Sequence, residues 1–154
     1  MTDFTIRPAT PADIPEILRQ RRAMFEDMGG ADSDSLDAML ASAEPYLRES
    51  MPQGSFLAWL AITSSGQFAG GAAVAVGSSP PHPWDPQPRR AYILNLYVYP
   101  EFRRMGMARR LMQTTLDWCK TEGFGTVTLH ASEGVRSLYE SFGFAQTNEM
   151  RLKL

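Results

Sequence analysis

The sequence is poor in several features that would assign a chain to a specialised class. Cys119 is its one cysteine, which excludes an internal disulfide and any multi-cysteine zinc site. No apolar run approaches the ~20 residues that a membrane-spanning helix needs, and the N-terminus lacks the basic and then apolar blocks of a signal peptide. We therefore expect a cytoplasmic protein that has no membrane partner and binds no metal.

Charge is also modest, with a net charge of −2, but it is unevenly spread. Residues 1–86 carry eleven acidic against five basic residues, and residues 87–154 carry ten basic against six acidic residues. The basic half favours an anionic cofactor and the acidic half a cationic or amine substrate, unless both halves merely carry solvated charges. The basic residues are too few, and not interleaved along an aromatic face, for a nucleic-acid partner.

A chain of 154 residues suits one domain, residues 1–154, with a single core. The one low-complexity patch is residues 77–88, which hold five of the eleven prolines. This patch is too short to link two domains. It predicts a rigid surface loop that carries Trp84.

Periodicity predicts the order of helices and strands. Apolar residues alternate at 4–8, as in a strand, and recur at helical spacing over 14–28. A second helix begins at Ser33 or Asp34, and Pro45 predicts that it breaks near Ala43. The later elements are a hairpin (56–62 and 68–76), a strand (92–99), a helix (105–119), a strand (127–131), a short helix (132–142) and a last strand (149–154). This order predicts an α/β (mixed α+β) fold with a β-α-β unit at the centre of a mixed sheet.

The stretch around which the rest is organised runs from the strand at 92–99 into the following helix. Pro100 ends the apolar run, and the turn that follows is rich in arginine and small residues, Arg103 to Ala108. Backbone N–H groups at such a helix start are unpaired, and the helix dipole and the arginines add positive charge, which suits a phosphate or pyrophosphate. The turn lacks the lysine of a P-loop and the three glycines of a dinucleotide fingerprint.

Arg103, Gly106 and Ala108 instead fit the Arg/Gln-x-x-Gly-x-Gly/Ala signature, so the segment resembles the GCN5-related N-acetyltransferase (GNAT) family. A second segment, Leu138-Tyr139 to Gly143-Phe144, is similar to the Leu-Tyr-x-x-x-Gly-Phe motif that closes the GNAT fold. The resemblance implies a twisted, mostly antiparallel mixed sheet of six or seven strands, flanked by about four helices. It also implies an acetyl-CoA-dependent N-acetyltransferase.

The family mechanism implies where acetyl-CoA binds. Backbone amides from Arg104 to Arg109 and the guanidinium of Arg103 or Arg104 would hold the pyrophosphate. The pantetheine arm would pair with the open edge of the strand, and an N–H near Leu96 would stabilise the thioester oxygen. The expected cofactor-binding residues are Leu96, Tyr97, Val98, Arg103, Arg104, Met105, Gly106, Met107, Ala108, Arg109, Ser132 and Tyr139.

Tyr139 is the expected general acid, which protonates the leaving thiolate after direct attack by the amine. Alternatively, Tyr139 is structural, with its ring packed in the core and its hydroxyl at the edge of the core. The family often has Asn and Ala where this chain has Ser132 and Val135, and a serine reaches the pantetheine less far. The resemblance implies direct attack without an acyl-enzyme, so no nucleophilic cysteine or serine is required. Cys119 lies on the apolar helix face and is expected in the core.

The sequence does not assign the general base to one residue, because the strand at 92–99 has no carboxylate. Glu26, Glu101 and His130 are candidates, and a water chain to solvent is equally compatible. The expected substrate walls are Phe25, Met28, Trp84, Tyr92 and Asn95. A small-molecule or peptide amine is the expected acceptor, and a homodimer is possible. The alternative function is a non-catalytic acyl-CoA-binding regulatory module, and a third is an unrelated nucleotide-binding domain.

Overall fold

A computed structural model describes residues 3–154. Its centre is one sheet with strand order β1-β2-β3-β4-β5, in which the first four strands are antiparallel and β5 runs parallel to β4. The strands are β1 (Phe4–Pro8), β2 (Phe56–Thr63), β3 (Phe68–Ser78), β4 (Arg89–Val98) and β5 (Val127–Thr128). The mixed sheet and the central β4-α3-β5 unit agree with the sequence prediction.

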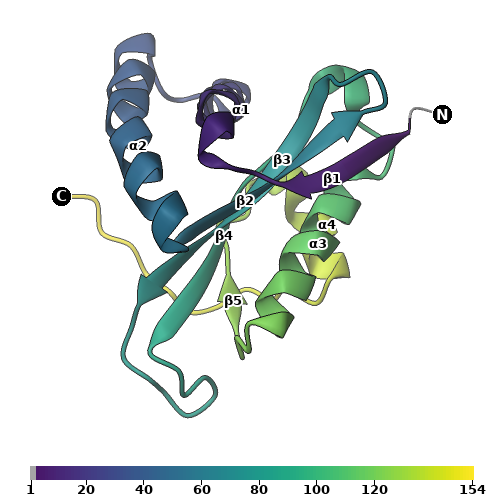
Figure 1. The fold of residues 1–154 in the computed structure, drawn as a ribbon. Helices are drawn as coiled ribbons and strands as arrows, with labels where there is room; N and C mark the ends of the chain where they lie inside the picture. The colour runs from purple at the N-terminus through teal and green to yellow at the C-terminus, as the bar shows by residue number, and fades with distance from the viewer. Residues whose placement is uncertain (1–2) are drawn as a thin grey trace.

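Four α-helices cover the sheet, α1 and α2 on one side and α3 with α4 on the other (Figure 1). The helices are α1 (Ile14–Met28), α2 (Ser33–Gln53), α3 (Met107–Thr121) and α4 (Arg136–Ser141). Short 3₁₀ turns lie at η1 (Pro11–Asp13), η2 (Pro100–Phe102) and η3 (Glu133–Val135). No helix of residues 3–154 is long and apolar enough to cross a membrane.

Three details of the sequence prediction were wrong. Residues 3–154 form five strands rather than six or seven. The last segment, 149–154, makes no strand: Met150, Leu152 and Leu154 alternate as predicted but are 94%, 81% and 109% exposed. Helix α2 also runs through Pro45 without a break. Buried leucines on both sides of the proline, Leu36 and Leu47, hold the two halves of α2 against the protein.

Two apolar clusters lie on opposite sides of the sheet. The α1 side contains Ile14 and Ile17 of α1 packed with residues of β2 and β3. The α3 side contains Leu111 and Met112, both fully buried, and Cys119, which is 1% exposed, as the sequence predicted. Both faces of the central strands are therefore covered, which explains why β2 and β3 are apolar almost throughout.

Strand β4 carries a bulge in its second half. Between the pairs Gly71–Tyr97 and Ala73–Leu94, β3 has one residue and β4 has two, Asn95 and Leu96. Asn95 has φ of 58°, in the left-handed region that non-glycine residues rarely enter. The bulge bends β4 where it leaves β5.

Glycine is required on β3 opposite this bulge. A Cβ at Gly71 would lie 2.5 Å from Oε1 of Gln20, a buried side chain of α1. A Cβ at Gly70 would lie 2.5 Å from the carbonyl oxygen of Tyr97. Gly71 thus lets α1 approach the sheet beside the bulge, and Gly70 lets β4 approach β3 closely.

Candidate active site

The turn between β4 and α3 leaves a row of backbone donors without acceptors. The first helical hydrogen bond runs from Arg110 N to Gly106 O, and within residues 3–154 the N–H groups of residues 104–109 have no protein acceptor. Gly106 occupies the N-cap position of α3 in a left-handed conformation, with φ of 77°. Among the described residues, no side chain caps this helix. Six successive N–H groups at a helix N-terminus form a site for an anion.

The charges around this turn favour an anion. The first turn of α3 has no acidic residue, and Arg104 is exposed, with φ of 63°. Arg103 is engaged elsewhere: its Nε donates to Val98 O at 2.8 Å and its Nη2 to Asp27 at 2.6 Å. Arg109 donates to Ser141 Oγ at 3.1 Å. Of the arginines expected at the pyrophosphate, Arg104 is therefore the better placed, and Arg103 instead ties the turn to α1.

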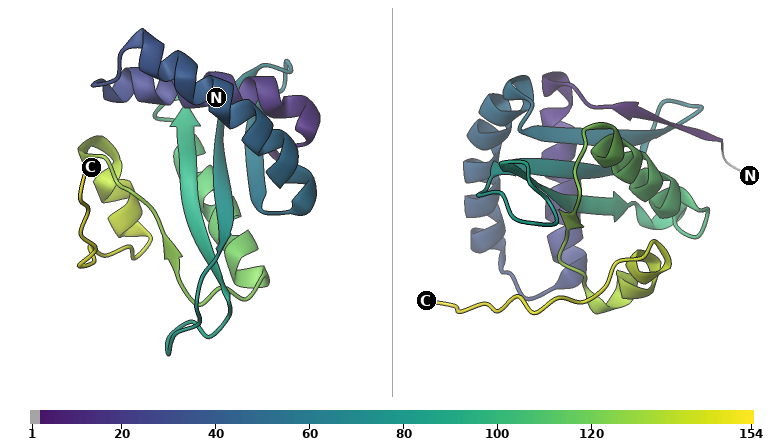
Figure 2. Two further views of the ribbon diagram at one scale, coloured as in Figure 1. Left: turned by 90° about the vertical axis from the view of Figure 1, so that its left-hand side faces the viewer. Right: turned by 90° about the horizontal axis from the view of Figure 1, so that it is seen from below.

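The side of β4 that faces β5 is open toward this turn. Strand β5 pairs with β4 only at Ala91 and Tyr92. From Ile93 to Val98, the described chain places no strand on that side of β4, and Figure 2 shows β5 leaving β4. The unpaired edge includes Leu96, Tyr97 and Val98 and leads from the split to the start of α3. An extended amide chain can pair with such an edge.

Tyr139 lies on α4 with its ring in the α3-side core, 7% exposed. Its ring meets Phe144 edge-on at 6.0 Å between centroids. The hydroxyl has no partner among residues 3–154 and is not one of their fully buried unpaired atoms, so it reaches the accessible surface. Burial, and then the nearby Tyr92, raise the pKa of Tyr139, so its phenol is protonated at neutral pH.

The remaining expected cofactor residues lie around the same opening. Met105 is exposed in the turn, whereas Met107 is buried in the core and Ala108 is partly buried against it. Only the backbone of these last two is available to a ligand. Ser132 is exposed at the start of η3, and its carbonyl accepts from Val135 N at 3.2 Å.

The candidate bases differ in their surroundings. Glu26 is exposed and pairs with Arg22 at 2.8 Å. Glu101 is exposed in η2. The Nδ1 atom of His130 meets the Tyr92 hydroxyl, and its Nε2 meets Arg151. Of the three, His130 alone is linked to a residue of β4.

The structure brings some of the expected substrate residues together. Asn95 Oδ1 accepts from Arg21 Nη1 at 2.6 Å, and the same guanidinium lies 5.0 Å from the ring centre of Phe25. Tyr92 is close enough to affect the pKa of Arg21. Met28 lies at the end of α1 and is 56% exposed.

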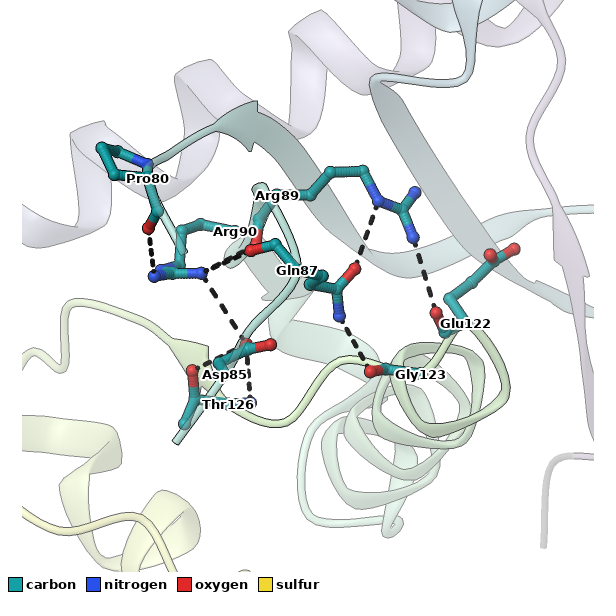
Figure 3. Close-up of polar contacts among 8 residues, drawn as sticks. All are labelled: Pro80, Asp85, Gln87, Arg89, Arg90, Glu122, Gly123 and Thr126. Atoms are coloured by element: carbon teal, nitrogen blue, oxygen red, sulfur yellow. Dashed lines mark hydrogen bonds and ion pairs between the residues drawn. The ribbon is translucent and has the colours of Figure 1, made fainter. Parts of the chain in front are cut away.

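Trp84 lies elsewhere, on the proline-rich loop between β3 and β4, where it is 75% exposed. Figure 3 shows how that loop is held: Asp85, which is 1% exposed, accepts from Thr126 N and Oγ1 at 3.2 Å each. Gln87 Nε2 donates to Gly123 O at 2.8 Å. The loop is thus fixed at the start of β5, before β4 and β5 diverge.

Sequence reasoning missed two polar residues of α1. Glu16 is 4% exposed and accepts from Gln20 Nε2 and from the Tyr99 hydroxyl, both at 2.9 Å. Burial, and then Glu16, raise the pKa of Tyr99. Arg21 lies on the apolar stripe of α1. A charged residue on such a stripe was the one feature of the sequence that could have marked Arg21 as functional. Glu16 gave no such signal, because its partner Tyr99 is 83 residues away.

The free N–H groups before α3 and the unpaired edge of β4 that leads to them suit the class of enzymes that bind an extended phosphorylated coenzyme. The family model for the acetyltransferase (GNAT) family matches residues 21–144. The chain belongs to this family, and it is an acetyl-CoA-dependent N-acetyltransferase.

Solved structures agree with this assignment. A GCN5-related N-acetyltransferase from Ralstonia eutropha JMP134 is 33% identical, with a TM-score of 0.92 over 99% of both chains. A predicted acetyltransferase from Clostridium acetobutylicum, solved with acetyl-CoA, is 26% identical, with a TM-score of 0.87 over 99% of this chain and 96% of that one. Glucosamine-6-phosphate N-acetyltransferase from Arabidopsis thaliana, 18% identical, shares the fold over 99% of this chain and 98% of that one (TM-score 0.67). A search of curated proteins found no match.

Proposed function

We propose that this enzyme transfers the acetyl group of acetyl-CoA directly to a primary amine, without an acyl-enzyme. The observation that carries the proposal is the row of free N–H groups at residues 104–109, at the end of an unpaired strand edge. These donors suit a pyrophosphate, and the exposed Arg104 adds a full positive charge beside them. Buried Cys119 is not needed as a nucleophile.

The open edge of β4 positions the rest of the coenzyme. Acetyl-CoA supplies an activated acetyl thioester at the end of an extended amide chain. The backbone of Leu96, Tyr97 and Val98 pairs with those amides, as an added strand would, and the exposed Ser132 hydroxyl lies on the other side of the split. The bulge at Asn95 turns a backbone N–H of β4 toward the thioester oxygen, where it stabilises developing negative charge.

Tyr139 acts as the general acid. Its hydroxyl donates a proton to the sulfur as the carbon–sulfur bond breaks, and the phenol then regains a proton from solvent. The raised pKa keeps the phenol protonated between turnovers. A proton transfer of this kind contributes roughly 10²–10⁴ in rate.

The attacking amine must lose a proton, and we place His130, acting through water, before Glu26 in this role. His130 meets the hydroxyl of Tyr92, a residue of the strand that holds the thioester, whereas Glu26 is exposed and paired with Arg22. Enzymes of the same fold are associated with small-molecule amines: the Arabidopsis protein is a glucosamine-6-phosphate N-acetyltransferase, and an aminoglycoside acetyltransferase from a soil metagenome was solved with sisomicin. We propose a small-molecule amine here too. The single domain, cytoplasmic location and homodimer stay predictions.

Release of free thiol from acetyl-CoA, measured across a panel of amines, peptides and aminoglycosides, tests the proposed function. We expect amine-dependent release by the wild-type protein. Tight acetyl-CoA binding with no release for any amine would instead show a non-catalytic binding module. Affinity for ATP with none for acetyl-CoA would show an unrelated nucleotide-binding site.

A further inference from the structure

Arg21 is a half-buried cation without a counter-ion. Its one polar contact among residues 3–154 is Asn95 Oδ1, at 2.6 Å from Nη1. The next residue on α1, Arg22, is also half buried but pairs with two carboxylates, Glu26 at 2.8 Å and Asp37 at 2.7 Å. A guanidinium has five N–H donors, and Asn95 uses one of them. Burying the remaining charge without an anion costs stability, so Arg21 is placed for a partner from outside the chain.

The surroundings of Arg21 resemble a binding pocket wall rather than a core. The Phe25 ring lies on one side, with 5.0 Å between its centre and the guanidinium carbon. The ionisable groups near enough to affect Arg21 are the phenols of Tyr92 and Tyr46, and no carboxylate of the described chain pairs with it. Burial lowers the pKa of Arg21. A planar anion in this place would exchange water for charge-assisted hydrogen bonds.

The position of Arg21 relative to the reaction decides what the anion belongs to. Arg21 holds Asn95, the left-handed residue of the β4 bulge, and the following residue, Leu96, lies where we place the thioester. An anion bound by Arg21 would therefore lie near Asn95, the neighbour of the residue at which we place the thioester. This separation suits an acceptor whose amine and anionic group are a few bonds apart.

We infer that the acceptor is an amine that also carries a carboxylate, such as an amino acid, and that Arg21 binds this carboxylate. This inference names the substrate class of the proposed acetyl-transfer site and rests on that function. One guanidinium matches one planar carboxylate in charge and in its forked geometry.

Matched acceptor pairs test the inference. We would measure kcat and KM for amino acids and for their carboxamides, which keep the amine and lose the negative charge. The wild-type enzyme should favour the acids, and Arg21→Gln should raise KM for the acids by about 10- to 100-fold while changing the amides little. Arg21→Lys, which keeps the charge without the fork, should fall between. A merely structural role for Arg21 would impair acids and amides alike.

Binding measurements keep the inference separate from the proposed function. Calorimetry with N-acetyl amino acids and their amides, the products of such a reaction, needs no turnover. Wild type and the control Arg48→Gln, which removes an exposed arginine paired within α2 to Glu44, should bind the acids; Arg21→Gln should not. Equal binding of acids and amides by the wild type would overturn the inference that Arg21 binds the acceptor's carboxylate. A preference for glucosamine 6-phosphate over every amino acid would overturn it too. Acid-selective binding without thiol release for any amine overturns the proposed function, and with it the acceptor role, but leaves carboxylate binding by Arg21 in place.

Discussion

Tyr139 shows how one residue combines packing and chemistry. Its ring belongs to the core with Phe144, while its hydroxyl reaches the surface, and Tyr92 of β4 is near enough to affect its pKa. The motif in the sequence indicated this residue, and both readings of it, core phenol and general acid, fit its position. What distinguishes them is the proton on its oxygen.

Tyr139→Phe should lower kcat roughly 10²- to 10³-fold, because the ring packing stays and only the donated proton is lost. The dissociation constant of acetyl-CoA should change little. Steady-state kinetics together with calorimetric titration of acetyl-CoA measure both quantities. An unchanged kcat, or a parallel loss of affinity and turnover, would show that the hydroxyl is structural.

Asp13 provides a pH dependence at the residue scale. The hydrogen bonds from Arg7, at 2.8 and 2.9 Å, lower the pKa of Asp13 to about 2, outweighing the opposing effect of burial; its ordinary value is 3.8. Because the folded pKa is depressed, the stabilisation is complete above pH ~4 and is lost as the pH falls toward 2.

The free energy of unfolding of the wild type should therefore exceed that of Asp13→Asn at pH 6. The difference should shrink steadily between pH 4 and pH 2. Urea titrations of both proteins at several pH values measure it. A difference that is constant over this range would mean that the pair with Arg7 does not stabilise the fold.

At the scale of elements, the sequence was most informative where local chemistry decides structure. The strand at Phe4–Pro8 was predicted from its alternation, and the small-residue strand predicted at 68–76 is observed at Phe68–Ser78. The segment 149–154 has the same alternation but forms no strand. Alternation predicts which side chains would share one face of a strand, but a strand also needs a neighbouring strand to pair with. The hydrogen bond from Arg21 to Asn95 and the one from Tyr99 to Glu16 join segments more than 70 residues apart, and no local pattern predicts them.

The turn before α3 yields a prediction with a close control. A Cβ at Gly106 meets no protein atom within 4 Å, but φ of 77° strains any larger residue and the new side chain would stand among the free N–H groups. Gly123, at the other end of α3, has φ of 81° and equally open space. Gly106→Val and Gly123→Val should thus lose similar stability, roughly 1–2 kcal/mol.

Only Gly106→Val should also lose acetyl-CoA, by at least about 100-fold in affinity, because it blocks the backbone approach to the phosphates. Thermal unfolding and calorimetric titration of both variants give the two quantities. If Gly106→Val binds acetyl-CoA as tightly as Gly123→Val, the pyrophosphate does not bind at this turn.

The sequence predicted the proline-rich loop but not the hydrogen bonds from Thr126 to Asp85 that hold it. Asp85→Ala should remove the acceptor for Thr126 N and Oγ1 and so loosen the start of β5. Hydrogen exchange should become faster at residues 126–128, while the amides of α1 should exchange as in the wild type. Protection that is unchanged at 126–128 would mean that the two-residue pairing with β4 alone holds β5.

On the scale of the whole molecule, the two sides of the sheet contribute different groups near the gap between β4 and β5. The α3 side supplies backbone donors and a phenol, and the α1 side supplies the half-buried Arg21, which donates to Asn95. The overall sheet and helix order followed from the sequence, whereas the meeting of Arg21 with Asn95 required the folded chain. Binding of acetyl-CoA to the folded state alone should therefore stabilise the entire domain.

At a concentration of 100 times the dissociation constant, acetyl-CoA should add about 2.7 kcal/mol to the free energy of unfolding. For a chain of this size, that raises the melting temperature by roughly 5–10 °C. ATP at the same concentration is the control and should raise it far less. Equal shifts with both ligands would favour a general nucleotide site.

The most direct test of the central claim is a nuclear magnetic resonance titration of ¹⁵N-labelled protein with coenzyme A, which observes the backbone N–H groups themselves. We predict that the largest downfield amide shifts fall within residues 104–109, with smaller shifts along the free edge of β4. Amides of 104–109 that do not move while coenzyme A binds would contradict the account, because the pyrophosphate would then be held elsewhere.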